Sequence, residues 1–251
     1  MNRSDWSRRD FTLRSLALLT VTLQTHTVHA QVKVMGSNGE GMEGEITSTG
    51  PKRRTAPPPG SAPGVQMAPT ILVVGDSLSA EYGIARGSGW VSLLANKLRE
   101  EQLGFQVVNA SVSGDTTAGG RSRLPMLLQQ TRPVLVVIEL GGNDALRGLD
   151  LASTQANLDA MIEACKAMQA RVVLVGMQIP PNYGADYAKR FASMYADLAK
   201  KHRIGSVPFL LKGIADAGDA SRWFQADRIH PREEAHPRML GNVWPEIRKQ
   251  L

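Results

Sequence analysis

Three residues of this chain could form a nucleophile and the pair of side chains that activates it. Ser77 lies on a Gly-Asp turn directly after the apolar run 71–74. Asp227 and His230 are three residues apart, so a tight turn would place the carboxylate beside the imidazole. A serine hydroxyl attacks well only when an adjacent base takes its proton and a third group orients that base. Ser77 alone could be an ordinary helix cap. Together, the three residues predict acyl transfer through a covalent intermediate on Ser77.

Acyl transfer also requires hydrogen-bond donors for the negative charge that develops on the attacked carbonyl oxygen. Gly114 follows the apolar run 107–110 and has no side chain to obstruct its backbone N–H. Asn143, in the Gly-Gly-Asn-Asp string 141–144, can donate from its side-chain amide. Each string by itself is typical of a plain turn. Their common position after apolar runs predicts that they form an oxyanion site for the carbonyl that Ser77 attacks.

The other histidines and the single cysteine are predicted to be structural. His26 and His29 belong to an N-terminal leader, while His202 and His236 lie in charged helical segments where exposure is expected. Cys165 lies in a helical pattern without a neighbour that would activate it, which predicts a small buried side chain. One cysteine also excludes an intrachain disulfide.

Short apolar runs must supply the strands that position these residues. They are nearly continuous, as in parallel strands buried on both faces, and cover residues 70–75, 106–110, 134–140, 171–177 and, weakly, 206–210. Helical patterns lie between them at 90–102, 117–130, 153–170 and 185–202, and a last helix follows Pro231. This alternation predicts a three-layer α/β/α sandwich whose site lies at the carboxyl ends of the strands.

The motifs as a set resemble the four blocks of the SGNH (GDSL) hydrolase family. The resemblance covers residues 70–251 and rests on the strings around Ser77, Gly114 and Asn143 and on Asp227-x-x-His230-Pro231. It implies Ser77 as nucleophile, His230 as base and Asp227 as the partner of that base. It also implies an oxyanion hole formed by Ser77 N–H, Gly114 N–H and the Asn143 amide. The resemblance further implies a flavodoxin-like sheet of five parallel strands, with no metal and no cofactor.

Within that family, the strings 108–117, 139–148 and 178–184 are similar to exported bacterial arylesterases and multifunctional thioesterase/lysophospholipases. The similarity implies a small-molecule substrate: an aryl ester, a short- to medium-chain acyl ester, a thioester or a lysophospholipid. One alternative is a carbohydrate O-deacetylase, although an aromatic content of 5% offers few platforms for a sugar. A binding module that has lost catalysis is another alternative, disfavoured because the four motifs are intact. Arg228 departs from the family pattern, which usually has glycine there.

Composition argues against other partners. The net charge is +6, of which residues 70–251 carry only +3, and no cluster of Lys and Arg with interleaved aromatic residues is present. Nucleic-acid binding is therefore not expected. A hydrophobic fraction of 42% is ordinary for a soluble globular protein.

Residues 1–30 predict an export signal. Four arginines give it a basic start, the mildly apolar run 16–23 follows, and residues 28–30 form a small-x-small cleavage site. The run is too short for a permanent membrane anchor. Arg8 and Arg9 resemble the twin-arginine export motif, and an ordinary Sec signal is the alternative. A periplasmic or secreted enzyme is the expectation.

Residues 31–69 predict a disordered linker. They contain several glycines and the run Pro57-Pro58-Pro59, with almost no apolar periodicity. The expected organisation is thus an export signal over 1–30, a linker over 31–69 and a hydrolase domain over 70–251.

Overall fold

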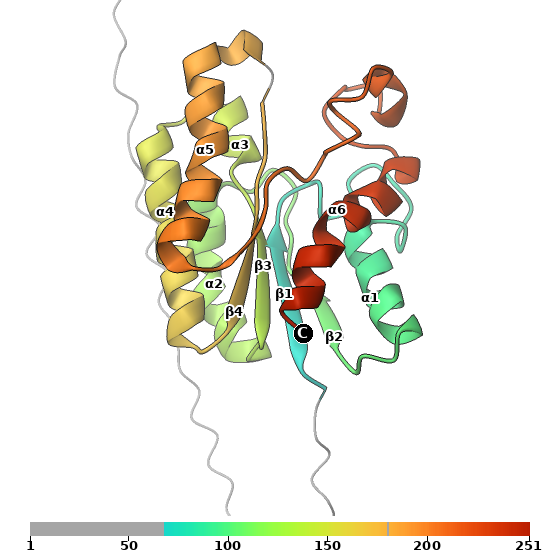
Figure 1. The fold of residues 1–251 in the computed structure, drawn as a ribbon, viewed down its shortest axis with the longest axis vertical. Helices are drawn as coiled ribbons and strands as arrows, with labels where there is room; N and C mark the ends of the chain where they lie inside the picture. The colour runs from blue at the N-terminus through green and yellow to red at the C-terminus, as the bar shows by residue number, and fades with distance from the viewer. Residues whose placement is uncertain (1–67, 180) are drawn as a thin grey trace, which may run out of the picture. The chain divides into compact units, whose positions relative to one another are not determined.

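Five parallel strands form the sheet in the part of the chain that the computed structural model describes, residues 68–179 and 181–251 (Figure 1). The export signal and nearly all of the linker, as predicted from sequence, lie outside the described residues. The strands run β2-β1-β3-β4-β5 across the sheet, the flavodoxin-like order. Their bounds are β1 (Thr70–Gly75), β2 (Gln106–Asn109), β3 (Leu135–Glu139), β4 (Arg171–Val175) and β5 (Gly205–Val207).

Helices cover both faces of this sheet. In Figure 1, α1 and α6 lie on one side, and α2, α4 and α5 lie on the other. The predicted three-layer α/β/α fold is therefore confirmed. The α-helices are α1 (Trp90–Glu100), α2 (Thr117–Thr131), α3 (Gly142–Leu146), α4 (Leu151–Ala167), α5 (Ala185–His202) and α6 (His236–Lys249). Short 3-10 helices are η1 (Pro181–Tyr183), η2 (Ala220–Trp223) and η3 (Glu233–Ala235).

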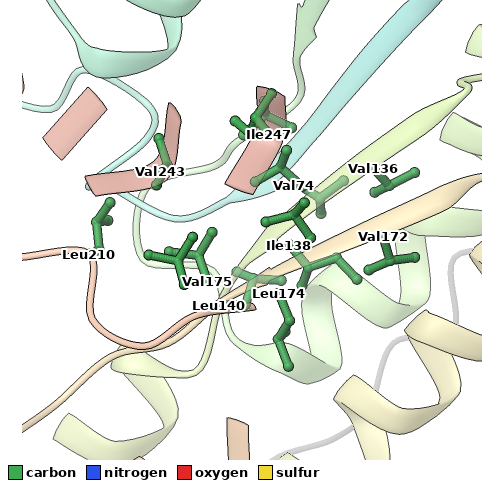
Figure 2. Packing of buried hydrophobic residues seen from close by; sticks show 14 of the residues in the cluster. Val74, Val136, Ile138, Leu140, Val172, Leu174, Val175, Leu210, Val243 and Ile247 are labelled. Atoms are coloured by element: carbon green, nitrogen blue, oxygen red, sulfur yellow. The ribbon is translucent and has the colours of Figure 1, made fainter. Parts of the chain in front are cut away.

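The core lies on both sides of the central strands. Every residue of β1 and β3 is buried, which explains why these strands read as unbroken apolar runs. Figure 2 shows Val74, Ile138 and Leu174 from three neighbouring strands close to Ile247 of α6. Buried strands of this kind hold the loops at their carboxyl ends in fixed positions.

Two histidines are less exposed than the sequence suggested. His202 and His236 are buried, so the expectation that they are exposed is wrong. His202 Nε2 lies 2.6 Å from Asp159 Oδ1, and His236 Nδ1 accepts a hydrogen bond of 3.1 Å from the Trp90 N–H. These partners help the rings to leave solvent, because one ring nitrogen of each histidine stays paired. Cys165 is buried as predicted, and burial raises the pKa of its thiol to about 12.

Candidate active site

Ser77 lies on the turn that follows β1. The turn begins at the buried Asp76, whose Oδ1 accepts a hydrogen bond of 3.0 Å from the Leu78 N–H. The Asp76 carbonyl accepts further bonds from the N–H groups of Ser79 and Ala80. The backbone around Ser77 is thereby fixed at the end of a buried strand, and the serine itself is only partly buried.

His230 connects Ser77 to Asp227. Its Nε2 lies 2.9 Å from Ser77 Oγ, and its Nδ1 lies 2.7 Å from Asp227 Oδ2. A carboxylate can only accept, so Nδ1 carries the proton and Nε2 is free to accept the proton of the serine hydroxyl. The structure therefore brings together the three residues that the sequence singled out.

The loop that carries Asp227 and His230 is closed by hydrogen bonds to the Asp227 carboxylate. Asp227 Oδ1 accepts from the backbone N–H of Ile229 at 2.9 Å and of His230 at 3.0 Å. Partial burial acts to raise the pKa of Asp227, but the bonds from the His230 ring and from these two N–H groups lower it to about 2. Asp227 is thus held as a carboxylate beside the imidazole.

Arg228 adopts a left-handed backbone conformation within this turn. Its φ is 59°, a conformation that glycine adopts without strain and a side chain with a Cβ does not. This explains physically why the family pattern usually has glycine at the position. Gln225 fixes the other end of the turn, because its N–H donates to the His230 carbonyl at 2.8 Å.

Tyr82 contacts the histidine from the turn after β1. Its ring centroid lies 4.3 Å from that of His230, and half of Tyr82 is exposed to solvent. Sequence reasoning missed this contact, and no spacing signal would have revealed it. Tyr82 therefore covers one side of the His230 ring.

The remaining donors follow β2 and β3. Gly114, with a φ of 78°, lies on the loop after β2, and Asn143 is the second residue of α3, after β3. Asn143 Nδ2 donates to Asp76 Oδ2 at 3.1 Å and to the Asp115 carbonyl at 2.9 Å. The amide of Asn143 therefore links the loops that carry Ser77 and Gly114.

An apolar cavity of about 270 Å³ adjoins these loops. Gly142 lies beside Asn143 in the chain, and Ile229 lies beside His230, so the cavity lies close to these two residues. Most of its wall is hydrophobic: Leu146, Met177, Ile179, Tyr183, Leu211, Ala215, Phe224 and Ile229, with Gln178 and Arg228 as the polar members.

One cluster of potential metal ligands occurs among the described residues. Asp159, Glu163 and His202 place ligand atoms within 4.8 Å of one another on α4 and α5. Both oxygens of Asp159 already accept from Lys201 Nζ, at 2.7 and 2.8 Å. The Lys201 ammonium thus already neutralises the Asp159 carboxylate of this cluster.

Comparison with known proteins identifies the family. The sequence pattern of the GDSL-like Lipase/Acylhydrolase family matches residues 73–238. The chain belongs to this family. The match spans the turn of Ser77, the loops of Gly114 and Asn143, and the loop of His230.

Named relatives of this GDSL hydrolase are esterases. Esterase TesA of Pseudomonas aeruginosa is 49% identical over 184 residues, which are 73% of this chain and 90% of that protein. Thioesterase 1/protease 1/lysophospholipase L1 of Escherichia coli K12 is 39% identical over 170 residues, 68% of this chain and 79% of that protein. The crystal structure of esterase EstA from Pseudoalteromonas sp., inhibited by monoethylphosphonate, has a TM-score of 0.68 at 39% identity and covers 72% of this chain and 97% of that chain. The chain is a serine esterase, as the sequence predicted.

Proposed function

We propose that Ser77, His230 and Asp227 are the catalytic triad of this esterase. The observation that carries the proposal is the unbroken hydrogen-bonded chain from Ser77 Oγ through both nitrogens of His230 to Asp227. The N–H groups of Ser77 and Gly114 and the amide of Asn143 form the oxyanion hole in this proposal. Their positions at the ends of neighbouring strands support it.

The reaction follows from these positions. Ser77 Oγ attacks the ester carbonyl carbon while His230 Nε2 takes the hydroxyl proton, and the carbonyl oxygen becomes an oxyanion. His230 then gives that proton to the departing alcohol or thiol, which leaves an acyl-serine. A water molecule then loses a proton to the same nitrogen and attacks the acyl-serine, and His230 gives that proton to Ser77 Oγ as the carboxylic acid leaves. Asp227 stabilises the imidazolium in both halves of the cycle.

The apolar cavity favours aryl and short- to medium-chain acyl esters as substrates, with thioesters and lysophospholipids as further members of the class. An apolar acyl or aryl group gains free energy from leaving water, roughly 25 cal/mol for each Å² that it buries. A carbohydrate O-deacetylase remains the alternative, but the cavity offers few groups that could pair with sugar hydroxyls. Its polar side chains are limited to Gln178, Arg228 and the Tyr183 hydroxyl.

Replacement of the nucleophile tests the triad. Ser77→Ala is expected to abolish hydrolysis of p-nitrophenyl esters and labelling by a fluorophosphonate probe. Ser193→Ala, which removes an exposed hydroxyl on α5, is the matched control and should behave as wild type. Labelling of Ser77→Ala at any other residue would refute the assignment. Absence of turnover in the wild type would favour a binding module.

A substrate profile tests the choice of class. Rates are measured for p-nitrophenyl esters from acetyl to palmitoyl, an acyl-CoA, a lysophospholipid and acetylated xylan. The cavity predicts that kcat/KM rises as the acyl chain grows beyond acetyl. A preference for acetylated xylan over every acyl ester would support the deacetylase instead.

We also propose that the enzyme is exported and acts in the periplasm or outside the cell. Residues 1–30 serve as the signal, residues 31–69 as a linker and residues 70–251 as the hydrolase domain. The proposal rests on the basic start and short apolar run of the leader. Within the described residues, no helix has the length and apolar character needed to cross a membrane. Replacement of both Arg8 and Arg9 by lysine should prevent export by the twin-arginine route, whereas export at the wild-type level would indicate Sec.

A further inference from the structure

The loop after β2 contains a partly buried ion pair that the proposed triad does not use. Arg123, on α2, donates from Nε to Asp115 Oδ2 at 2.8 Å, and the two side chains are only 21% and 12% exposed. Charges withdrawn from water lose solvation that their mutual attraction must offset. Asp115 directly follows Gly114, whose N–H is proposed for the oxyanion hole. The place of the ion pair beside this donor calls for an explanation beyond stability.

Residues 112–115 form a β-turn that sets the direction of the Gly114 N–H. The Asp115 N–H donates to the Val112 carbonyl at 3.1 Å and closes the turn. Gly114 is the third residue of the turn and has a φ of 78°, as in a type II turn. Such a turn closes through the N–H of its fourth residue, so the closing bond leaves out the Gly114 N–H. The aim of this donor therefore depends on what holds the turn.

Arg123 ties this turn to the ends of two strands. Besides Asp115, its guanidinium binds two carbonyl groups. Nη1 donates to the Ala110 carbonyl, directly after β2, and Nη2 donates to the carbonyl of Gly75, the last residue of β1, at 3.4 Å. Gly75 lies two positions before Ser77. One side chain thus connects the turn of the oxyanion donor to the strand end that carries the nucleophile.

The start of α2 is shaped to receive the Asp115 carboxylate. Asp115 Oδ1 accepts from the Thr116 N–H at 3.0 Å. A Cβ at Gly119, in the first turn of α2, would overlap this same oxygen. Glycine within a helix costs about 0.5–1 kcal/mol relative to alanine. Gly119 thus leaves, at some cost to the helix, the volume that the carboxylate needs to reach Arg123.

Two other side chains hold the backbone carbonyls of the turn. Asn143 Nδ2 donates to the Asp115 carbonyl at 2.9 Å, and Arg147 Nη2 donates to the Gly114 carbonyl at 2.9 Å. Both donors come from α3 and the residue that follows it, four positions apart. The bond of Arg147 is exposed, where water competes for both partners. The bonds of Arg123 are partly buried and are the ones that reach the strand ends.

We propose that Arg123 is a positioning residue for the oxyanion hole, which holds the Gly114 N–H in place relative to Ser77 by binding Asp115 and the ends of β1 and β2. A donor or reacting group misplaced by about 1 Å can cost about a hundredfold in rate. The guanidinium also offsets the charge of Asp115, which would otherwise repel an oxyanion bound beside it. This inference rests on the oxyanion role proposed for Gly114.

Two substitutions at position 123 test the proposal. Arg123→Met removes every donor, and we expect kcat for a p-nitrophenyl ester to fall by about tenfold to a hundredfold while KM stays within about threefold. Arg123→Lys keeps the charge and one donor group, so its kcat should lie between those of Arg123→Met and wild type. Arg121→Met is the control, because it removes an exposed guanidinium from the same helix, and it should leave kcat near the wild-type value. An Arg123→Met enzyme as fast as this control would overturn the proposal.

A double-mutant cycle tests whether Arg123 acts through Asp115, and its single variant decides the matter even if Arg123→Met does not fold. Asp115→Ala removes the carboxylate but keeps the backbone of the turn, and it should lower kcat by about tenfold. In Arg123→Met the same exchange should add little, because the ion pair is already broken. Unchanged kcat in Asp115→Ala, or losses that multiply in the double variant, would overturn the proposal.

Affinity for butylboronic acid separates this inference from the proposed function. The boronic acid forms a tetrahedral adduct with an activated serine, and one of its oxygens takes the place of the oxyanion. Its Kd should rise in Arg123→Met by about the factor that kcat loses, and should not change in Arg121→Met. A wild type that does not bind the boronic acid would overturn the oxyanion hole and this inference together. Tight binding by the wild type and equally by Arg123→Met would overturn the role of Arg123 alone.

Discussion

Replacement of Asp144 by alanine should destabilise the enzyme strongly, because this buried carboxylate ties three helices together. Asp144 lies in α3 and is 2% exposed. Its Oδ2 accepts from the backbone N–H of Thr117, the first residue of α2, at 2.9 Å. Its Oδ1 accepts from the hydroxyl of Thr117 at 2.5 Å and from the hydroxyl of Thr154, on α4, at 3.3 Å.

The magnitude follows from what alanine would leave unpaired. The Thr117 N–H is buried and would lose its acceptor, at a cost of about 1–3 kcal/mol. The buried Thr117 hydroxyl adds about 1 kcal/mol, and loss of a negative charge at the start of α2 adds about 0.3–2 kcal/mol. Thr154 keeps the Asp150 carbonyl at 3.2 Å and adds little. We expect the free energy of unfolding to fall by about 3–5 kcal/mol in total.

Equilibrium unfolding in urea measures this change from the midpoint and the slope. Asp144→Asn keeps one acceptor for the Thr117 N–H and should cost about 1–2 kcal/mol. Thr154→Val removes the longest of the three bonds to Asp144, together with the bond to the Asp150 carbonyl, but leaves both bonds from Thr117 in place, so it should cost less than Asp144→Ala. A loss below about 1 kcal/mol in Asp144→Ala would show that water or a relaxed backbone satisfies Thr117, and would refute the reasoning.

Three further predictions concern the site itself. Asn143→Ala should lower kcat by about 10²–10³ with little change in KM, because the Asn143 amide acts on charge that exists only in the transition state. Steady-state kinetics measures both constants, and a kcat within about threefold of wild type would remove Asn143 from the oxyanion hole. Asp227→Asn should retain more activity than His230→Ala, because Asp227 orients the imidazole, whereas His230→Ala removes it, and Asp227, with a pKa of about 2, is held as the carboxylate. An Asp227→Asn enzyme no more active than His230→Ala would contradict this. Arg228→Gly should raise the free energy of unfolding by about 0.5–1 kcal/mol by relieving the left-handed strain, whereas Arg228→Ala should not.

The sheet and the order of its elements could be predicted because buried parallel strands appear in the sequence as nearly continuous apolar runs. The runs at β1 and β3 match the observed strands closely, since both are buried on every side. β5 is shorter than the predicted strand over 206–210 and comprises Gly205–Val207. Pro208 follows it directly, and proline cannot extend the ladder of hydrogen bonds.

Other features had no local signal. By itself the string 141–144 is typical of a plain turn, and a run of only five residues does not reveal that Gly142 begins the short helix α3. Glu139 ends an apolar strand, and nothing in its neighbours along the chain shows that Asp76 lies against it. Pairs of this kind depend on which strands become neighbours, and so they appear only with the three-dimensional fold.

The distance along the chain between Ser77 and His230 also has a consequence for folding. Their side chains meet across 153 positions, and the loop of His230 follows the last strand of the sheet. Contacts so distant in sequence form late, because the chain between them must first be ordered. Recovery of esterase activity should therefore report the final step of refolding, after the helical signal has returned. If His230 is the base, as proposed, a nascent chain that has not yet emerged beyond β5 would be inert toward esters.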